Sequence, residues 1–302
     1  RGVMVETEQE EKRCGYVALV GRPNVGKSTL LNHLLRQKIS ITSRKPQTTR
    51  HRILGILSDQ KTQCIFADTP GLHSKHMKAL NKVMNDTVIS TLRDVDMVLF
   101  VIERLTFNSE DELVLQQVQK CTVPVILVIN KIDQIQDKER LLPHIQELID
   151  KHVFSDIIPV SALGGHNLER LEMLVKGGLP EGPFLFPKDQ VTDRSSRFIA
   201  AEMIREKVTR QLGDELPYEM TVEIESFKLE GAVTHVHGLI LVDKPGQKKI
   251  IIGNDGSRLK QIGSSARADM ELAFDGKVML NLWVKVKGGW ADDDRTLQSL
   301  GY

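Results

Sequence analysis

Short apolar runs alternate with amphipathic stretches through residues 15–180, and this alternation predicts an α/β domain. We expect buried strands at 16–20, 61–68, 97–102, 123–129 and 157–160, and helices at 29–35, 77–92, 111–120, 138–151 and 167–175. Strands and helices that alternate in this way form a mostly parallel sheet with helices on both faces. Residues 51–57, followed by the polar turn 59–61, predict a hairpin that adds one antiparallel edge strand.

A different pattern begins near residue 197. Residues 220–225 alternate apolar and polar positions, with Val222 and Ile224 inward, and 233–242 and 278–286 predict two further strands. The proline-containing stretch before this region has the composition of a linker. We therefore divide the chain into a mobile tail (1–14), an α/β domain (15–180), a linker (181–196) and a smaller α+β domain (197–302).

The composition narrows the class of protein. A chain of 302 residues suggests about two domains, and its net charge of +1 predicts no strong bulk attraction to polyanions. Any contact with nucleic acid must then be a local patch. No apolar run approaches membrane-spanning length and no signal sequence is visible, so we expect no membrane span. Cys14, Cys64 and Cys121 have no metal-like spacing, which favours reduced packing residues in a cytosolic protein.

The first chemical motif is the sequence GRPNVGKS at 21–28, between a predicted strand and a predicted helix. In that position it is typical of the phosphate cradle of P-loop nucleotidases. Backbone N–H groups and the helix N-terminus would surround the phosphates, Lys27 would contact the terminal ones, and Ser28 would bind Mg²⁺. The candidate contacts in this loop are Gly21, Asn24, Val25, Gly26, Lys27, Ser28 and Thr29. The alternative is a glycine-rich turn before a structural helix.

A second motif selects guanine as the base. Asn130-Lys131-Ile132-Asp133 ends an apolar run, and the Asp133 carboxylate can accept hydrogen bonds from guanine N1–H and its amino group. Asn130 can tie this loop to the phosphate loop, and the Lys131 stem can lie along the base. After the next apolar run, the backbone of Ser161-Ala162 can donate to guanine O6. A surface turn is the alternative for this motif.

Residues between these motifs suit magnesium and the γ-phosphate. Asp68 ends a predicted strand and would hold Mg²⁺ through water, while the Gly71 N–H would meet the γ-phosphate. Upstream, the sequence PQTTR at 46–50 offers hydroxyls for a loop that orders around both groups. We favour Thr49 as the ligand of Mg²⁺, with Thr48 the alternative. A solvated turn is the competing interpretation.

The second domain carries a glycine loop of its own. Gly253-Asn254-Asp255-Gly256 lies between an apolar run and a predicted helix, as in the loop with which KH domains clamp single-stranded nucleotides. The candidate RNA contacts are Lys248, Lys249, Ile252, Gly253, Asn254, Asp255, Gly256, Arg258 and Lys260. A plain capping turn is the alternative. We expect Trp283 and Trp290 to be packing residues.

Together these motifs resemble the Era family, the bacterial ribosome-assembly GTPases. The likeness rests on 21–28, 46–50, 68–72, 130–133 and 161–162 followed by the KH-type loop, with 39–44, 47–52 and 282–287 also similar. It covers essentially residues 15–302. The resemblance implies a GTPase domain and a KH domain of the variant in which a helix, here 197–212, precedes the first strand.

The resemblance also implies what the protein does. It implies a Mg²⁺-dependent GTPase that binds GTP and GDP, binds the 3′ region of small-subunit ribosomal RNA and assists assembly of the small ribosomal subunit. Peripheral association with the inner membrane is implied as well, although the chain shows no mechanism for it. We expect the protein to be a cytoplasmic monomer.

The expected hydrolysis has one complication at Leu72. Many small GTPases place there the glutamine that orients the attacking water, and leucine cannot hydrogen-bond. Hydrolysis must then depend on electrostatics around the phosphates, and slow intrinsic turnover is expected. Related GTPases use the residue at Asn24 to hold K⁺, which would add positive charge. The expected catalytic residues are Lys27, Asn24, Thr49 and Gly71.

Two other functions remain open at this point. One is a guanine-nucleotide-dependent RNA-binding switch in which hydrolysis only resets the state. The other is a structural RNA-binding module with a degenerate nucleotide domain. The intact Lys27, Ser28, Asp68 and Asp133 argue against the second.

Overall fold

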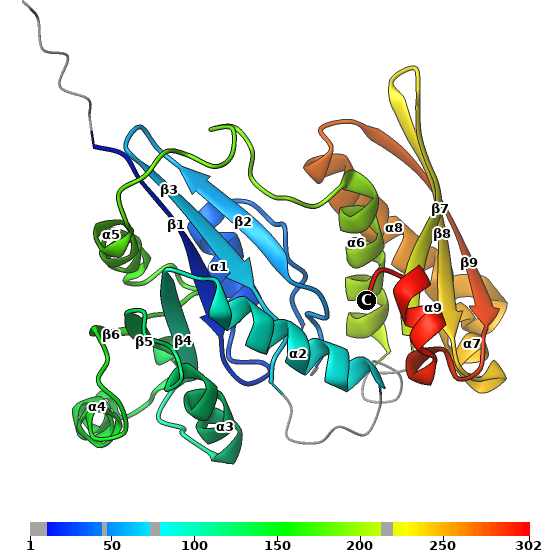
Figure 1. Cartoon of the computed structure of the whole chain (residues 1–302). Coiled ribbons are helices and arrows are strands. Elements are labelled where there is room, and N and C mark those ends of the chain that lie inside the picture. Colours follow the sequence, from blue (N-terminus) through cyan, green and yellow to red (C-terminus); the bar gives the residue numbers. More distant parts are fainter. Residues whose placement is uncertain (1–10, 44–46, 73–78, 213–219) are drawn as a thin grey trace, which may run out of the picture.

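The computed structural model describes residues 11–43, 47–72, 79–212 and 220–302, which form two domains side by side (Figure 1). The first domain contains a six-stranded sheet in the order β2-β3-β1-β4-β5-β6. Its strands are β1 (Arg13–Val20), β2 (Ile53–Ser58), β3 (Thr62–Asp68), β4 (Met97–Glu103), β5 (Val125–Asn130) and β6 (Asp156–Pro159). β2 is antiparallel to β3 and the other neighbours are parallel. The predicted mostly parallel sheet with one antiparallel edge strand is confirmed.

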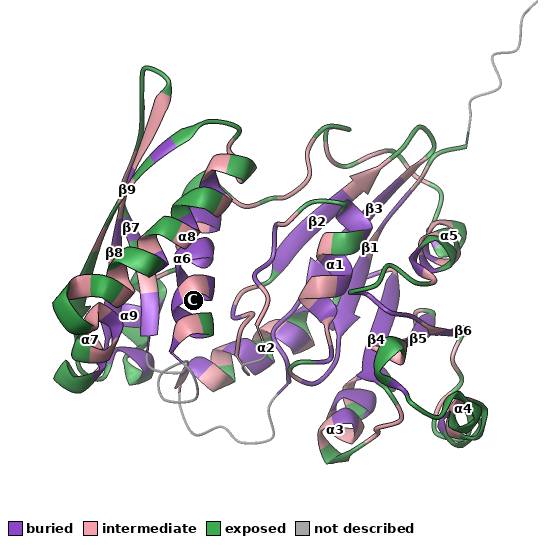
Figure 2. Ribbon diagram, turned by 180° about the vertical axis from the view of Figure 1, so that it is seen from behind, coloured by how far each residue is buried: buried purple, intermediate pink, exposed green. Residues whose placement is uncertain are grey.

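Helices cover both faces of this sheet. α1 (Lys27–Leu35) and α5 (Leu168–Gly178) pack on one face, and α2 (Ala79–Arg93), α3 (Ser109–Val118) and α4 (Leu141–Ile149) on the other. In β4, Leu99 joins the first core while Val98 and Phe100 join the second. A strand buried on both faces needs apolar residues at every position, which explains the continuous apolar runs. Figure 2 shows buried strands between helices that turn exposed residues outward.

The second domain is a three-stranded sheet covered by helices on one face. Its strands are β7 (Met220–Glu230), β8 (Val233–Val242) and β9 (Lys277–Val286), and its first three helices are α6 (Ser196–Gln211), α7 (Pro245–Ile252) and α8 (Ser257–Ala273). β7 and β8 are antiparallel, whereas β8 and β9 are parallel. A parallel pair needs a long crossover, which α7 and α8 provide. The turn η4 (Trp290–Asp292) and helix α9 (Asp294–Ser299) follow β9. The predicted smaller α+β domain is confirmed.

Two local predictions differ from the structure, and one run without an assigned element proves to be a helix. The helix expected at 138–151 begins with a separate turn, η2 (Lys138–Arg140), because Pro143 fits only in the first turn of α4. The apolar run before Gly253, for which the sequence predicted no element, belongs to α7, since Pro245 starts a helix there. Trp283 is 48% exposed on the outer face of the sheet, where its ring meets that of His237, so the packing prediction is wrong for this residue.

The predicted linker lies along the edge of the first sheet. The N–H of Ile56 donates to Val191 O (2.8 Å), and the N–H of Leu54 donates to the side chain of Asp193 (3.0 Å). The Gln63 side chain accepts from the backbone N–H groups of two further linker residues. An uncovered edge strand exposes unpaired backbone groups, and here the linker covers β2.

Candidate functional site

A cavity of about 1030 Å³ lies where residues of both domains meet. Its walls include Asn24 after β1, Gly71 after β3, Arg104 after β4 and Lys131 after β5, so it opens at the carboxyl ends of the parallel strands. Nucleotides bind at this edge in open α/β sheets. Of the predicted contacts, those that line the cavity are Asn24, Gly26, Lys27, Ser28, Thr29, Thr49, Gly71, Asn130, Lys131, Asp133 and Ala162. Gly21, Val25, Asp68 and Ser161 lie behind this wall.

The phosphate loop is held in a shape that requires glycine. Gly26 has a φ of 100°, and a Cβ there would lie 2.2 Å from Asn130 Nδ2. That nitrogen donates to Val25 O (2.8 Å), so the guanine motif is tied to the phosphate loop in the way the sequence predicts. Lys27 Nζ donates to Gly21 O (2.9 Å), and burial lowers the pKa of Lys27 to about 8. Phosphate oxygens in the cavity would favour its charged form.

Three oxygen-bearing side chains converge beside this loop. Ser28 Oγ lies 2.8 Å from Thr49 Oγ1 and donates to Asp68 Oδ2 (2.7 Å). Burial raises the pKa of Asp68, while the Ser28 hydrogen bond and the Lys27 charge oppose that rise. The hydroxyl of Thr48 does not join this group: Thr48 Oγ1 lies 2.9 Å from Ser43 Oγ. Two hydroxyls and a buried carboxylate are a donor set of the kind that Mg²⁺ prefers, and the geometry favours Thr49 over Thr48.

Hydrogen bonds also hold the residues that are predicted to bind guanine. Ser161 Oγ donates to Asp133 Oδ1 (2.6 Å), and the N–H of Ala162 donates to Asn130 Oδ1 (2.9 Å). Lys131 Nζ donates to a backbone carbonyl of the phosphate loop (2.5 Å). The loops after β5 and β6 are thereby fixed to each other, with the Asp133 carboxylate at the cavity wall.

Leu72 stands where many small GTPases have a water-orienting glutamine, and its side chain has no hydrogen-bonding group. It is 7% exposed and packs in the core on the α2 face of the sheet. Asn24, by contrast, is exposed, lines the cavity and has a φ of 66°, a left-handed conformation that asparagine tolerates.

The glycine loop of the second domain joins helices α7 and α8. Gly253 has a φ of 73°, and a Cβ there would lie 2.7 Å from Arg258 Cβ, so no larger residue fits. Arg258 Nη1 donates to Ile250 O (2.9 Å) and so ties the start of α8 to the end of α7. The exposed candidates are Lys249, Asn254, Asp255 and Lys260. The loop thus presents backbone and two lysines to solvent beside a helix N-terminus.

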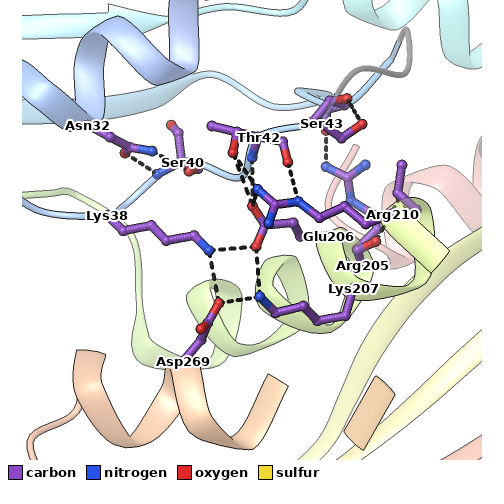
Figure 3. A network of polar contacts seen from close by, with 12 residues as sticks. Asn32, Lys38, Ser40, Thr42, Ser43, Arg205, Glu206, Lys207, Arg210 and Asp269 are labelled. Atoms are coloured by element: carbon purple, nitrogen blue, oxygen red, sulfur yellow. Dashed lines mark hydrogen bonds and ion pairs between the residues drawn. The ribbon is translucent and has the colours of Figure 1, made fainter. Parts of the chain in front are cut away.

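An ion-pair cluster connects the two domains beside the cavity (Figure 3). We call it the Glu206 cluster; its members are Lys38, Thr42, Glu206, Lys207, Arg210 and Asp269. Glu206 is fully buried and accepts from Lys38 Nζ (2.6 Å) and the N–H of Thr42 (2.9 Å). Lys38 Nζ also donates to Asp269 Oδ2 (2.9 Å). The segment after α1 is therefore bonded to both α6 and α8.

The segment that bears Thr49 has further contacts with α6. Arg205, also on that helix, donates to the backbone carbonyls of Thr48 and Gln47 and pairs with Glu202. Thr49 thus lies between Ser28 of the phosphate loop and a helix of the other domain.

Residues near the end of the chain also contribute to the interface between the two domains. Arg50 is 1% exposed, donates to Met220 O (2.7 Å) and lies over the Trp290 ring, 5.9 Å from its centroid. Trp290 is itself buried and packs with Leu80 and Met84 of α2. The segment around η4 and α9 therefore contacts both the loop that carries Thr49 and the helix that follows the Gly71 loop.

Sequence reasoning missed these interface residues. Arg205, Glu206 and Arg210 are charged residues on a helix, and such residues ordinarily face solvent. The one residue that could have indicated the interface is Arg50, which follows the predicted Mg²⁺ ligand Thr49. The sequence around Arg50 does not indicate, however, that its partners belong to the second domain. Thr209 and Arg210 also line the cavity, although neither belongs to a nucleotide motif.

Comparison with known proteins assigns each of the two domains to a protein family. Residues 16–131 match the family described as 50S ribosome-binding GTPase, and residues 215–291 match the KH domain family. GTPase Era of Azotobacter vinelandii is 60% identical over 296 residues, which cover 98% of this chain and 99% of that protein. GTPase Era of Pseudomonas syringae pv. tomato is 61% identical over 290 residues, 96% of this chain and 97% of the relative.

Two solved structures resemble the whole chain. A crystal structure of Era in complex with MgGDPNP and nucleotides 1506–1542 of 16S ribosomal RNA superposes with a TM-score of 0.93 at 41% identity and covers 96% of this chain and 99% of that one. A single-residue variant of Aquifex aeolicus Era bound to GDP·AlF4− gives a TM-score of 0.92 at 42% identity, with the same coverage.

Proposed function

The chain belongs to the Era family of GTPases, and we propose that it binds and hydrolyses GTP and binds the 3′ region of small-subunit ribosomal RNA to assist assembly of that subunit. The relative crystallised with MgGDPNP and 16S ribosomal RNA supports both ligands. One observation supports the switch character above all others. The segment with Thr49 contacts Ser28 of the phosphate loop and, through Thr48 and Gln47, Arg205 of the RNA-binding domain.

Each part of the nucleotide site has a role in this proposal. Asp133 binds the guanine edge, and Asn130 fixes the base loop to the phosphate loop. Lys27 and the backbone of its loop neutralise phosphate charge, which develops further as the γ-phosphate leaves. Ser28 and Thr49 would hold Mg²⁺, with Asp68 acting through water, and the ion would stabilise charge on the β- and γ-phosphates when bound. Buried Leu72 supplies no hydrogen bond to water, which supports slow intrinsic turnover.

We further propose a K⁺ site at Asn24. GTP hydrolysis should be about ten- to a hundredfold faster in K⁺ than in Na⁺ at equal ionic strength, because K⁺ held by the exposed Asn24 side chain would add charge next to the phosphates. Phosphate release by purified protein in the two salts measures this. Asn24→Ala should remove the difference, whereas Asn281→Ala, on the outer face of the second sheet, should retain it. Equal rates for the parent in both salts would exclude the K⁺ role.

The RNA site is proposed at the loop Gly253–Gly256. Asn254→Asp places a second carboxylate beside the exposed Asp255, which should repel phosphate and lower RNA affinity by about tenfold or more while GTP affinity stays the same. Fluorescence anisotropy with single-stranded RNA of the small-subunit 3′ end measures the effect. Asn281→Asp is the matched control, since it adds the same charge to an exposed position of the same domain. Parent-like RNA affinity of Asn254→Asp would mean that the loop only starts α8.

We propose that the protein acts as a cytoplasmic monomer, with peripheral association with the inner membrane supported by family resemblance alone. Within the described residues, no helix is long and apolar enough to cross a membrane.

A further inference from the structure

Arg210 lines the nucleotide cavity although it belongs to the RNA-binding domain. It is the penultimate residue of α6, and Thr209 beside it lines the same cavity. Of the other charged members of the Glu206 cluster, Lys38, Glu206, Lys207 and Asp269, none lines this cavity within the described part of the chain. Among the described residues of the second domain, Arg210 is thus the cation at the cavity wall.

The guanidinium of Arg210 is held in a defined orientation. Nε donates to Thr42 O (3.0 Å) and Nη2 donates to Thr42 Oγ1 (2.8 Å), while Nη2 also pairs with Glu206 Oε1 (3.1 Å). Figure 3 shows Arg210 reaching across to the segment of Thr42. These contacts use Nε and Nη2, and among the described residues no acceptor contacts Nη1. A guanidinium fixed on one edge keeps its other donors available for an anion.

The charge of the Glu206 cluster also favours an anion. Three cations, Lys38, Lys207 and Arg210, face two carboxylates, Glu206 and Asp269. The two lysines share Asp269 on the side of α8. The cluster therefore has one more positive than negative charge, and its cation at the cavity wall is Arg210, whose side chain is 46% exposed.

The position of Arg210 indicates which part of a nucleotide it meets. Asp133 and Ala162 define the base end of the cavity, and Lys27, Thr49 and Gly71 define the end for the terminal phosphates. The other lining residues include Thr42 and Arg210. In a nucleotide, the groups that join the base to the terminal phosphates are the ribose and the α-phosphate. We propose that Arg210 binds the α-phosphate of the guanine nucleotide, so that the RNA-binding domain completes the nucleotide site. The inference rests on the guanine-nucleotide function proposed above.

The α-phosphate is common to GTP and GDP, and this sets the expected result. Arg210→Ala should weaken binding of GDP and of a non-hydrolysable GTP analogue by the same factor, about tenfold or more, and leave binding of guanosine unchanged. Arg210→Lys, which keeps the charge without the planar fork, should lose less. Titration calorimetry with the full-length chain measures each ligand, and thermal unfolding confirms that the variants are folded.

Lys207→Ala is the matched control, because it removes one positive charge from the same cluster and the same helix without touching the cavity. It should change nucleotide affinity less than twofold. An equal loss in Lys207→Ala and Arg210→Ala would overturn the proposal in favour of a general field effect. Loss for the GTP analogue alone, or no loss in a folded Arg210→Ala, would also overturn it. A parent protein that binds neither GDP nor the analogue would instead contradict the nucleotide function itself.

Discussion

Asp133→Asn should lower the affinity for GTP by about 10- to 150-fold and make xanthosine triphosphate the better ligand. The Asp133 carboxylate lies at the cavity wall with its orientation fixed by Ser161 Oγ (2.6 Å). Guanine offers two donors to that carboxylate, and asparagine would meet one of them with its own N–H₂. The lost charge-assisted contact costs about 1.5–3 kcal/mol. Xanthine has an oxygen in place of the amino group, and this oxygen accepts from the new amide.

Titration of both nucleotides against parent and variant measures this reversal. Asp137→Asn is the control, because it makes the same charge change four positions later, at the N-cap of η2 and outside the cavity wall. It should leave GTP affinity as in the parent. Unchanged GTP affinity in Asp133→Asn would remove Asp133 from the base site, and an equal loss in both variants would mean that only net charge matters.

RNA should bind about 5- to 150-fold more tightly when the protein holds a GTP analogue than when it holds GDP. The γ-phosphate distinguishes the two states, and Thr49 and Gly71 are the residues that would meet it. The Thr49 segment contacts Arg205 of the second domain, and α2, which follows Gly71 in the chain, packs against Trp290. A ligand shifts only an equilibrium in which it favours one state. Because Glu206 bonds the segment after α1 to α6, Glu206→Gln should bring the ratio of the two RNA affinities close to one.

Anisotropy with the same RNA in the two nucleotide states gives this ratio. Glu271→Gln is the control, since its carboxylate pairs with Arg267 inside the second domain and not across the interface. Linkage requires the converse as well: RNA must raise the affinity for the GTP analogue by the same factor. Equal RNA affinities in both states of the parent would mean that the domains are only tethered.

The fold and the nucleotide motifs were predictable because their causes are local. A strand buried on both faces must be apolar at each position, so β1, β4 and β5 are visible as runs. The side chains proposed to bind the nucleotide follow directly after such strands, and parallel strands bring their carboxyl ends to one edge. The sequence therefore predicted Asn130 beside the phosphate loop, and the structure has its Nδ2 at 2.8 Å from Val25 O.

The domain interface was not predictable in the same way. Lys38 and Asp269 are separated by 231 positions, and neither lies in a motif. Charged residues on α6 look like a solvated face until a second domain covers them, because burial is decided by tertiary packing and not by helix periodicity. The same limit applies to Trp283 and Trp290, whose local sequences do not tell which one is buried.

The burial of Arg50 has a consequence for synthesis. Its acceptor, Met220 O, lies 170 positions later in the chain, and a bacterial ribosome needs about 10–30 s to add that many residues. The six strands and the helices α1 to α5 of the first domain all precede α6, so this domain can fold as a unit late in that interval, before α6 has been added. Its Thr49 segment then has neither Arg205 nor Trp290 to lie against. In a nascent chain the first domain can thus be folded before the residues that cover its Thr49 segment, and before Arg210 at its cavity, have been added.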